Sequence, residues 1–193
     1  MTLIELNTYI STYLKIQDFP NDISLNGIQV QNSQPAVKEI KKIAFAVDAC
    51  ADTIHRAHLA QADMLFVHHG LFWGYEQSLT GIHYDRIRQL IMNDIALYAC
   101  HLPLDAHQEI GHNYALARQI GLENLEPFGV WKNTVIGVKG TFTKPKTMEQ
   151  IIKAMFTDGA APVTVLPFGN KDIKTAGILC GGGAREVEQA IEQ

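Results

Sequence analysis

The chain has 193 residues, of which 47% are hydrophobic and 19% charged, and its formal net charge is -4. This is the composition of an ordinary globular protein, and it excludes a fibrous or intrinsically disordered chain. The negative net charge gives no broad positive field, so a nucleic-acid partner would need a local basic patch and is not expected.

The sequence carries no sign of secretion or of membrane insertion. Its first residues lack the basic stretch and apolar core of a signal peptide, and no apolar run is long enough to cross a bilayer. The three cysteines are too few and too scattered for a disulfide framework. We therefore expect a cytoplasmic protein without a membrane partner.

Helical and strand patterns alternate along the first two thirds of the sequence. Thr2 and Glu5 form a capping-box pattern, and apolar residues then recur at helical spacing as far as Leu14. Short apolar strands separated by helices predict an α/β fold with a mixed, largely parallel sheet flanked by helices. The predicted strands are 43–47, 64–67 and 95–99, and the predicted helices are 50–61, 84–92 and 113–120.

A second, smaller α/β domain is predicted after residues 126–129, where Pro and Gly interrupt the pattern. The boundary divides the chain into residues 1–127 and residues 128–193. The last helical pattern begins at Glu186 and has no capping signal before Gln193, so we expect the sequence to be part of a longer protein. Within the second domain we predict strands at 135–142, 163–166 and 176–179 and a helix at 147–156.

All eight histidines lie between His55 and His112, and the long segments on either side contain none. Imidazole is the commonest metal ligand in proteins, and histidines grouped with carboxylates hold zinc, iron, nickel or manganese. The crowding of histidines therefore indicates a divalent metal site in the first domain.

Four residues are the best candidates for this site because of where they stand relative to the strands. His68 and His69 directly follow the predicted strand 64–67, and His101 follows the strand 95–99, with Asp105 four residues later. The carboxyl ends of parallel strands meet at one edge of a sheet, where ligands bind. We expect the backbone to turn just after the first strand, so that both adjacent imidazoles point into one cleft.

The remaining histidines have simpler interpretations. His55, His58 and His83 are expected to be surface residues or hydrogen-bond partners. His107 and His112 flank a possible helix start, where capping or support of a metal ligand is as good an explanation as ligation.

Three aromatic residues, Phe72, Trp73 and Tyr75, follow the histidine pair closely. Two interpretations remain open for them. Such residues are most often part of a hydrophobic core, but they can also form the wall of a pocket for a flat substrate.

Four motifs are distinctive when they occur together: Val-His-His-Gly-Leu-Phe-Trp at 67–73, His-Leu-Pro-Leu-Asp-Ala-His at 101–107, Gly-His-Asn at 111–113 and Ser-Leu-Asn-Gly-Ile-Gln-Val at 24–30. With them the sequence resembles the Nif-three-like family, whose members are also described as type-two GTP cyclohydrolase I homologues. The resemblance runs along nearly the whole chain, including the strand and Gly-rich turn at 180–183.

The resemblance implies a two-domain α/β fold, a dinuclear centre with two divalent metal ions per complete subunit, and a homohexameric ring. By position, His68, His69 and Asp105 correspond to metal ligands, and Asp105 is the expected bridge between the two ions. His101 belongs to the same motif and is our candidate catalytic residue. The family completes its site with a His-x-x-x-Glu motif near the C-terminus, and this sequence ends before any such motif.

Two functions remain open at this stage. The first is a metal-dependent hydrolase that acts on a nucleotide such as GTP, by a cyclohydrolase-like ring opening, with His101 moving a proton. The second is a non-catalytic, metal-stabilised hexameric scaffold or regulatory protein. Fold and metal ligands do not determine which substrate enters a cleft, so the sequence alone does not choose between them.

Overall fold

The computed structural model describes residues 1–192, which form two compact units that divide between Pro103 and Leu104. Each unit has its own sheet and its own hydrophobic core. The predicted fold class, α/β with a mixed, largely parallel sheet and a second α/β part, is confirmed. The domain boundary that the sequence analysis places between residues 127 and 128 stays a prediction.

The first unit contains a four-stranded sheet with the order β1-β4-β3-β2. Strands β2, β3 and β4 are parallel to one another, and β1 is antiparallel to β4. The short strand β1 is not predicted from the sequence, because four residues after a turn leave little periodicity to detect. The strands are β1 (Gly27–Val30), β2 (Ile43–Asp48), β3 (Met64–His69) and β4 (Ala96–Ala99).

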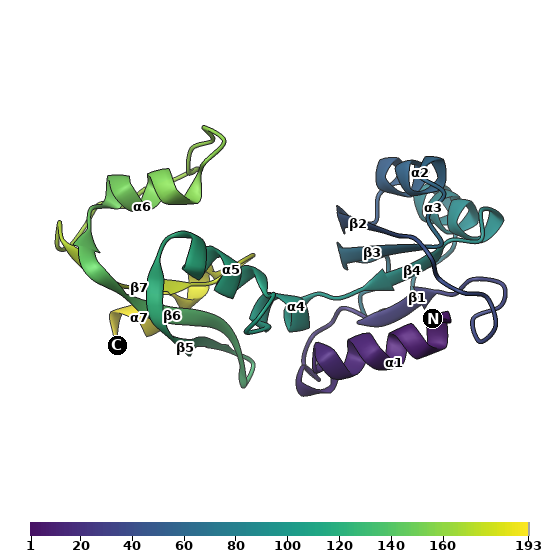
Figure 1. The fold of residues 1–193 in the computed structure, drawn as a ribbon, viewed down its shortest axis with the longest axis horizontal. Coiled ribbons are helices and arrows are strands. Elements are labelled where there is room, and N and C mark those ends of the chain that lie inside the picture. The colour runs from purple at the N-terminus through teal and green to yellow at the C-terminus, as the bar shows by residue number, and fades with distance from the viewer. Residues whose placement is uncertain (193) are drawn as a thin grey trace. The chain divides into compact units, whose positions relative to one another are not determined.

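Helices cover both faces of this sheet, as Figure 1 shows: α2 (Ala51–Leu59) and α3 (Gly81–Met92) lie on one face and α1 (Leu3–Tyr13) on the other. The α1 helix begins at the predicted capping box, in which Thr2 and Glu5 exchange hydrogen bonds. The main core of the unit is formed by apolar side chains from α2, α3, β3 and β4, among them Ile54, Ala57, Leu65, Val67, Ile87, Leu90 and Leu97.

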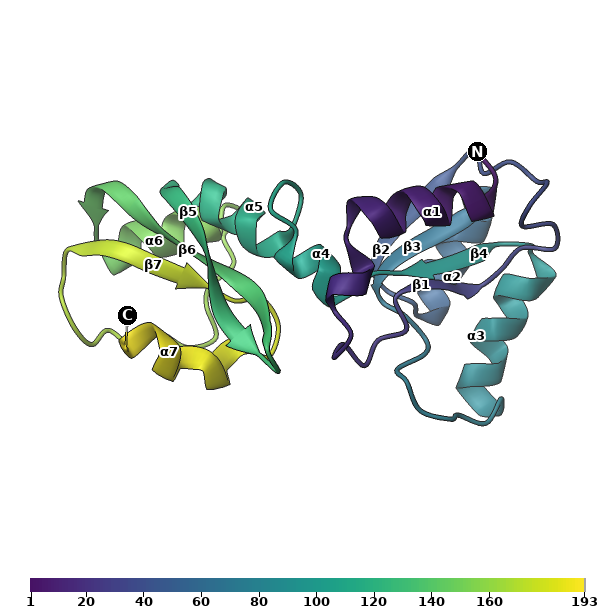
Figure 2. The ribbon, with the colours of Figure 1, turned by 90° about the horizontal axis from the view of Figure 1, so that it is seen from below.

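The second unit contains an antiparallel sheet with the order β5-β6-β7. Helices α5 and α6 contribute to one core on this sheet, and α7 lies on the opposite face from α6 (Figure 2). The strands are β5 (Leu122–Trp131), β6 (Thr134–Lys146) and β7 (Ile173–Ile178), and the helices are α5 (His112–Gln119), α6 (Met148–Met155) and α7 (Val187–Ile191). The short elements are η1 (Ile16–Asp18), α4 (Leu102–Ala106) and η2 (Gly183–Glu186).

One prediction for the second unit is wrong. The segment 163–166 is not a strand, and Val163 and Leu166 are exposed, so this apolar run has no core to pack against. The segment 126–129, where Pro and Gly interrupt the sequence pattern, lies within β5. Because β5 is an edge strand, it tolerates Pro127, which has no N–H to donate.

None of the helices in the described part of the chain combines the length and the apolar character that a bilayer crossing requires.

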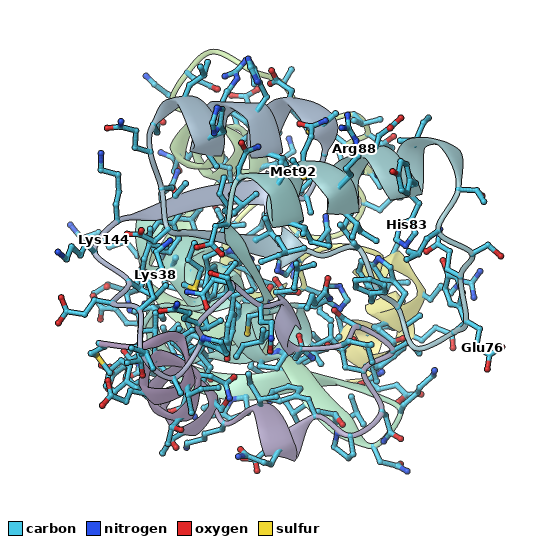
Figure 3. All side chains as sticks on the ribbon, turned by 90° about the vertical axis from the view of Figure 1, so that its right-hand side faces the viewer. Lys38, Glu76, His83, Arg88, Met92 and Lys144 are labelled. Carbon is cyan, nitrogen blue, oxygen red and sulfur yellow. The ribbon has the colours of Figure 1, made fainter. Side chains whose placement is uncertain are left out.

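The central strand β4 should dominate the stability of the first unit. Leu97 is fully buried, so Leu97→Ala should lower the free energy of unfolding by about 2–5 kcal/mol through lost burial and the cavity left behind. Met92 lies on α3 (Figure 3) and is 74% exposed. Met92→Ala should therefore change the free energy of unfolding by no more than about 0.5 kcal/mol. Urea unfolding followed by circular dichroism measures both values, and equal midpoints for the two variants would contradict this view of the core.

Candidate metal centre

Three histidines gather at the carboxyl ends of two neighbouring parallel strands. β3 ends at His69, and β4 ends two residues before His101. One ring nitrogen from each of His68, His69 and His101 lies within 4.8 Å of the other two. The ring centroids are 4.5 Å apart for His68 and His69, 5.0 Å for His68 and His101, and 5.7 Å for His69 and His101. We call these three residues the histidine triad.

The adjacent pair belongs to β3 itself, whereas the sequence suggested that both residues follow the strand. Successive residues of a regular strand point to opposite faces of a sheet, yet the rings of His68 and His69 are close together. Each ring is held by a different neighbouring segment, His68 by the residue that follows β4 and His69 by the last residue of β2. These tethers hold the two rings at one edge of the sheet.

The tether on His68 determines which of its ring nitrogens can bind a metal. Its Nδ1 lies 3.0 Å from the carbonyl oxygen of Cys100. A carbonyl oxygen only accepts hydrogen bonds, so Nδ1 carries the proton and donates. In the neutral ring the lone pair is then on Nε2, which is the form of imidazole that ligates metals.

The other two rings are held in the same way by carboxylates. His69 Nδ1 lies 2.7 Å from Asp48 Oδ1, and His101 Nδ1 lies 2.9 Å from Asp22 Oδ1. An ionised carboxylate only accepts, so both rings also carry their proton on Nδ1. The arrangement of carboxylate, imidazole and ligating nitrogen recurs at metal sites, where the carboxylate orients the ring and raises its basicity.

Asp22 is the best-anchored of these supporting residues, with a side chain only 1% exposed. Burial by itself would raise the pKa of its carboxyl group, but hydrogen bonds from His101, Asn26 and Ser24 outweigh burial, and the pKa is lowered. The backbone N–H of Leu102 donates to the same carboxylate. Asp22 therefore stays ionised, and it binds both the side chain of His101 and the backbone N–H of Leu102.

The loop after β3 is fixed by a single side chain, that of Gln29 in β1. Its Oε1 accepts from the N–H groups of Leu71 at 2.6 Å and Phe72 at 3.2 Å, and its Nε2 donates to the carbonyl oxygens of Leu25 and Phe72. A Cβ on Gly70 would lie only 2.3 Å from the Gln29 side chain. Gly70 is therefore required for this close approach.

Asp105 belongs to the second unit, where it is 5% exposed. Its carboxylate accepts from Nδ1 of His112 at 2.8 Å, and this hydrogen bond raises the pKa of His112. The buried amide of Asn113 donates to the carbonyl oxygens of Asp105 and Ile136 and accepts from the N–H of Cys180. Asn113 thereby fixes the backbone at Asp105 to strand β6 and to the segment that follows β7.

The remaining histidines do not join the triad. His55 and His58 lie on the exposed side of α2, as expected. His107 accepts hydrogen bonds from the N–H groups of two following residues, which is a local turn role. His83 is buried and packs edge-on against Phe72, and its Nε2 has no hydrogen-bond partner among the residues that the structure describes.

Sequence reasoning missed the supporting residues Asp22, Asp48 and Gln29. Asp48 could have been found, because parallel pairing of the two predicted strands places it opposite His69. Gln29 lies in the motif at 24–30, but that motif did not indicate its role, and Asp22 had no signal. The contacts of both residues join segments 40 to 80 residues apart in the sequence.

The chain matches the model of one protein family, Duf34/NIF3 (NGG1p interacting factor 3), over residues 1–193. A curated relative named "GTP cyclohydrolase 1 type 2 homolog", from Treponema pallidum, is 40% identical over 225 residues. That alignment covers 99% of this chain and 78% of the relative.

Two solved structures are similar as well. The crystal structure of TTHA1606 from Thermus thermophilus has a TM-score of 0.71 and 41% identity, and the alignment covers 81% of this chain and 61% of that one. The protein ybgI, described as being of unknown function, has a TM-score of 0.86 and 29% identity, with coverage of 100% of this chain and 74% of that one. The chain thus spans between about three fifths and four fifths of the length of these proteins.

The Gln29 side chain should hold the loop that follows the triad. In Gln29→Leu the N–H groups of Leu71 and Phe72 lose their acceptor, which should cost about 1–3 kcal/mol of local stability. Hydrogen–deuterium exchange should then be faster at these two amides. Gln17→Leu, at an exposed position of η1, is the matched control and should leave the exchange unchanged. Unchanged protection in Gln29→Leu would show that the loop does not depend on this side chain.

Proposed function

Because the chain belongs to the Duf34/NIF3 family, we propose that it is a divalent-metal-dependent hydrolase. The observation that carries the proposal is the histidine triad, in which ring nitrogens lie within 4.8 Å of one another and each Nδ1 is hydrogen-bonded to an oxygen acceptor. Imidazoles that carry their lone pair on Nε2 fit zinc, iron, nickel or manganese better than they fit calcium or magnesium.

The proposed ligands are His68, His69 and Asp105. Asp105 follows His101 by four residues, about one turn of helix, and is contained in α4. Its buried carboxylate would add the negative charge that neutral imidazoles cannot provide, and a carboxylate can bridge two ions. In this proposal a complete subunit holds two ions, and bound metal supplies Lewis acidity and activates water for attack on an electrophilic carbon or phosphorus.

His101 is the proposed proton carrier. Histidine is the side chain best suited to accept and release a proton near neutral pH. The buried, ionised carboxylate of Asp22 holds Nδ1 of His101, so that proton transfer takes place at Nε2. Asp22 has the positioning role that an aspartate has next to a catalytic histidine in hydrolases: it fixes the tautomer and the orientation of the ring.

The proposed substrate is a nucleotide such as GTP. The curated relative from Treponema pallidum is named as a GTP cyclohydrolase 1 type 2 homolog, and it is similar to this chain over nearly the whole chain length. The alternative function is a metal-stabilised oligomeric scaffold, and an activity assay can distinguish it from the hydrolase. Turnover lost on chelation and restored by metal supports the hydrolase, whereas metal-dependent assembly without nucleotide turnover contradicts it.

Metal content tests the ligand assignment. Elemental analysis of purified protein should find stoichiometric divalent metal in the wild type and none in His68→Ala/Asp105→Ala. His58→Ala is the matched control, because His58 is an exposed histidine of the same unit, and it should keep the metal. Metal retained by the double variant, or absent from the wild type after exposure to zinc, iron, nickel and manganese, would show that the assignment is wrong.

His101→Ala separates the two roles that His101 could have. As a proton carrier it should leave the metal content unchanged, while the rate of GTP hydrolysis falls by about 10²–10⁴-fold. His55→Ala, at an exposed position of α2, should leave both quantities unchanged. Loss of metal in His101→Ala would contradict the proton-carrier role and would make His101 a third nitrogen ligand.

A further inference from the structure

We propose that Trp73 is a stacking surface that recognises a planar heteroaromatic ring beside the histidine triad. This inference rests on the proposed function, because it assigns a substrate class to the same site. It chooses between the two interpretations that the sequence left open for the aromatic residues after the histidine pair.

The indole ring borders two members of the triad. Its centroid lies 5.1 Å from that of His101, with an interplanar angle of 77°, and 6.0 Å from that of His69, with an angle of 41°. Trp73 is half-buried, so part of its surface packs against the protein and part is accessible. A small molecule that reaches His69 and His101 is therefore also within reach of the indole.

Trp73 does not need to move to take this role. Its Nε1–H donates to the carbonyl oxygen of Gly70 at 3.2 Å, which orients the ring. The preceding residue, Phe72, accepts a hydrogen bond from the N–H of Leu25 and is held by Gln29. On the other side, Gly74 has a φ of +74°, and a Cβ there would lie 3.0 Å from the carbonyl oxygen of Ile23.

These contacts hold the indole in a fixed orientation, which suits a surface that recognises a ligand. A side chain that is already fixed loses little conformational entropy when a ligand binds, so more of the contact energy contributes to affinity.

The accessible part of the indole favours a planar ring at this place. A heteroaromatic ring can stack on the indole, and base–aromatic stacking contributes about 1–3 kcal/mol per base, or roughly 5- to 150-fold in affinity. The part of the substrate beside the triad is then the base, and the phosphates lie farther away.

Calorimetric titration of the zinc-loaded protein with guanosine tests this inference, with ribose as the probe that lacks a planar ring. Wild-type protein should bind guanosine with a saturable heat signal and ribose much more weakly. Trp73→Leu should weaken guanosine binding about tenfold or more, and Trp73→Phe, which keeps an aromatic face, should recover most of the affinity. Trp131→Phe replaces a tryptophan of β5 and is the matched control, which should bind as the wild type does.

Metal content and circular dichroism of each variant are measured in the same samples. Guanosine binding that is equal in Trp73→Leu and in the wild type, with metal and fold intact, would overturn the role of Trp73 and leave the proposed hydrolase untouched. Ribose that binds as tightly as guanosine would overturn it too. If Trp73→Leu fails to fold, the contrast between Trp73→Phe and a Trp73→Met variant, which is apolar but has no ring, decides: equal affinities overturn the stacking role.

Discussion

The site depends on one kind of interaction, the hydrogen bond from an imidazole Nδ1 to an oxygen acceptor. His68 donates to the carbonyl oxygen of Cys100, His69 to Asp48 and His101 to Asp22. Each bond orients a ring and also determines its tautomer, so three Nε2 lone pairs are presented at one edge of the sheet. Without these bonds the rings would be free to rotate, and any ligand of the rings would lose affinity because it would have to order them on binding.

Both the parallel sheet and the loops at its carboxyl edge position the three histidines and their hydrogen-bond acceptors. The register of β2 with β3 places Asp48 opposite His69, so the position of Asp48 beside this histidine follows from strand pairing alone. The other supports come from loops: Asp22 binds the segment after β4, and Gln29 binds the segment after β3. Because β3 and β4 are buried between helices on both faces, the edge that carries the triad is attached to the most stable part of the first unit.

Much of the framework was predictable from the sequence, because long-established rules for parallel sheets apply to it. Three apolar runs became β2, β3 and β4, and the rule that strand ends converge brought His68, His69 and His101 together. The rule was less useful for irregular features. Strand β5 was missed because an edge strand tolerates Pro127, and the strand at 163–166 was wrong because apolar residues need a surface to pack against. The roles of Asp22 and Gln29 could not be predicted, although Gln29 lies in the motif at 24–30, since these roles exist only once distant segments have come together.

The central claim, that fixed Nδ1–H tautomers present Nε2 to a metal ion, is tested most directly by nuclear magnetic resonance. Long-range proton–nitrogen correlation spectra of protein with ¹⁵N-labelled histidine report the protonation state of each ring nitrogen. We predict that His68, His69 and His101 are protonated on Nδ1, and that added zinc shifts the Nε2 resonances of His68 and His69. Protonation on Nε2 in these rings, or zinc-induced shifts confined to the exposed His55 and His58, would contradict the account.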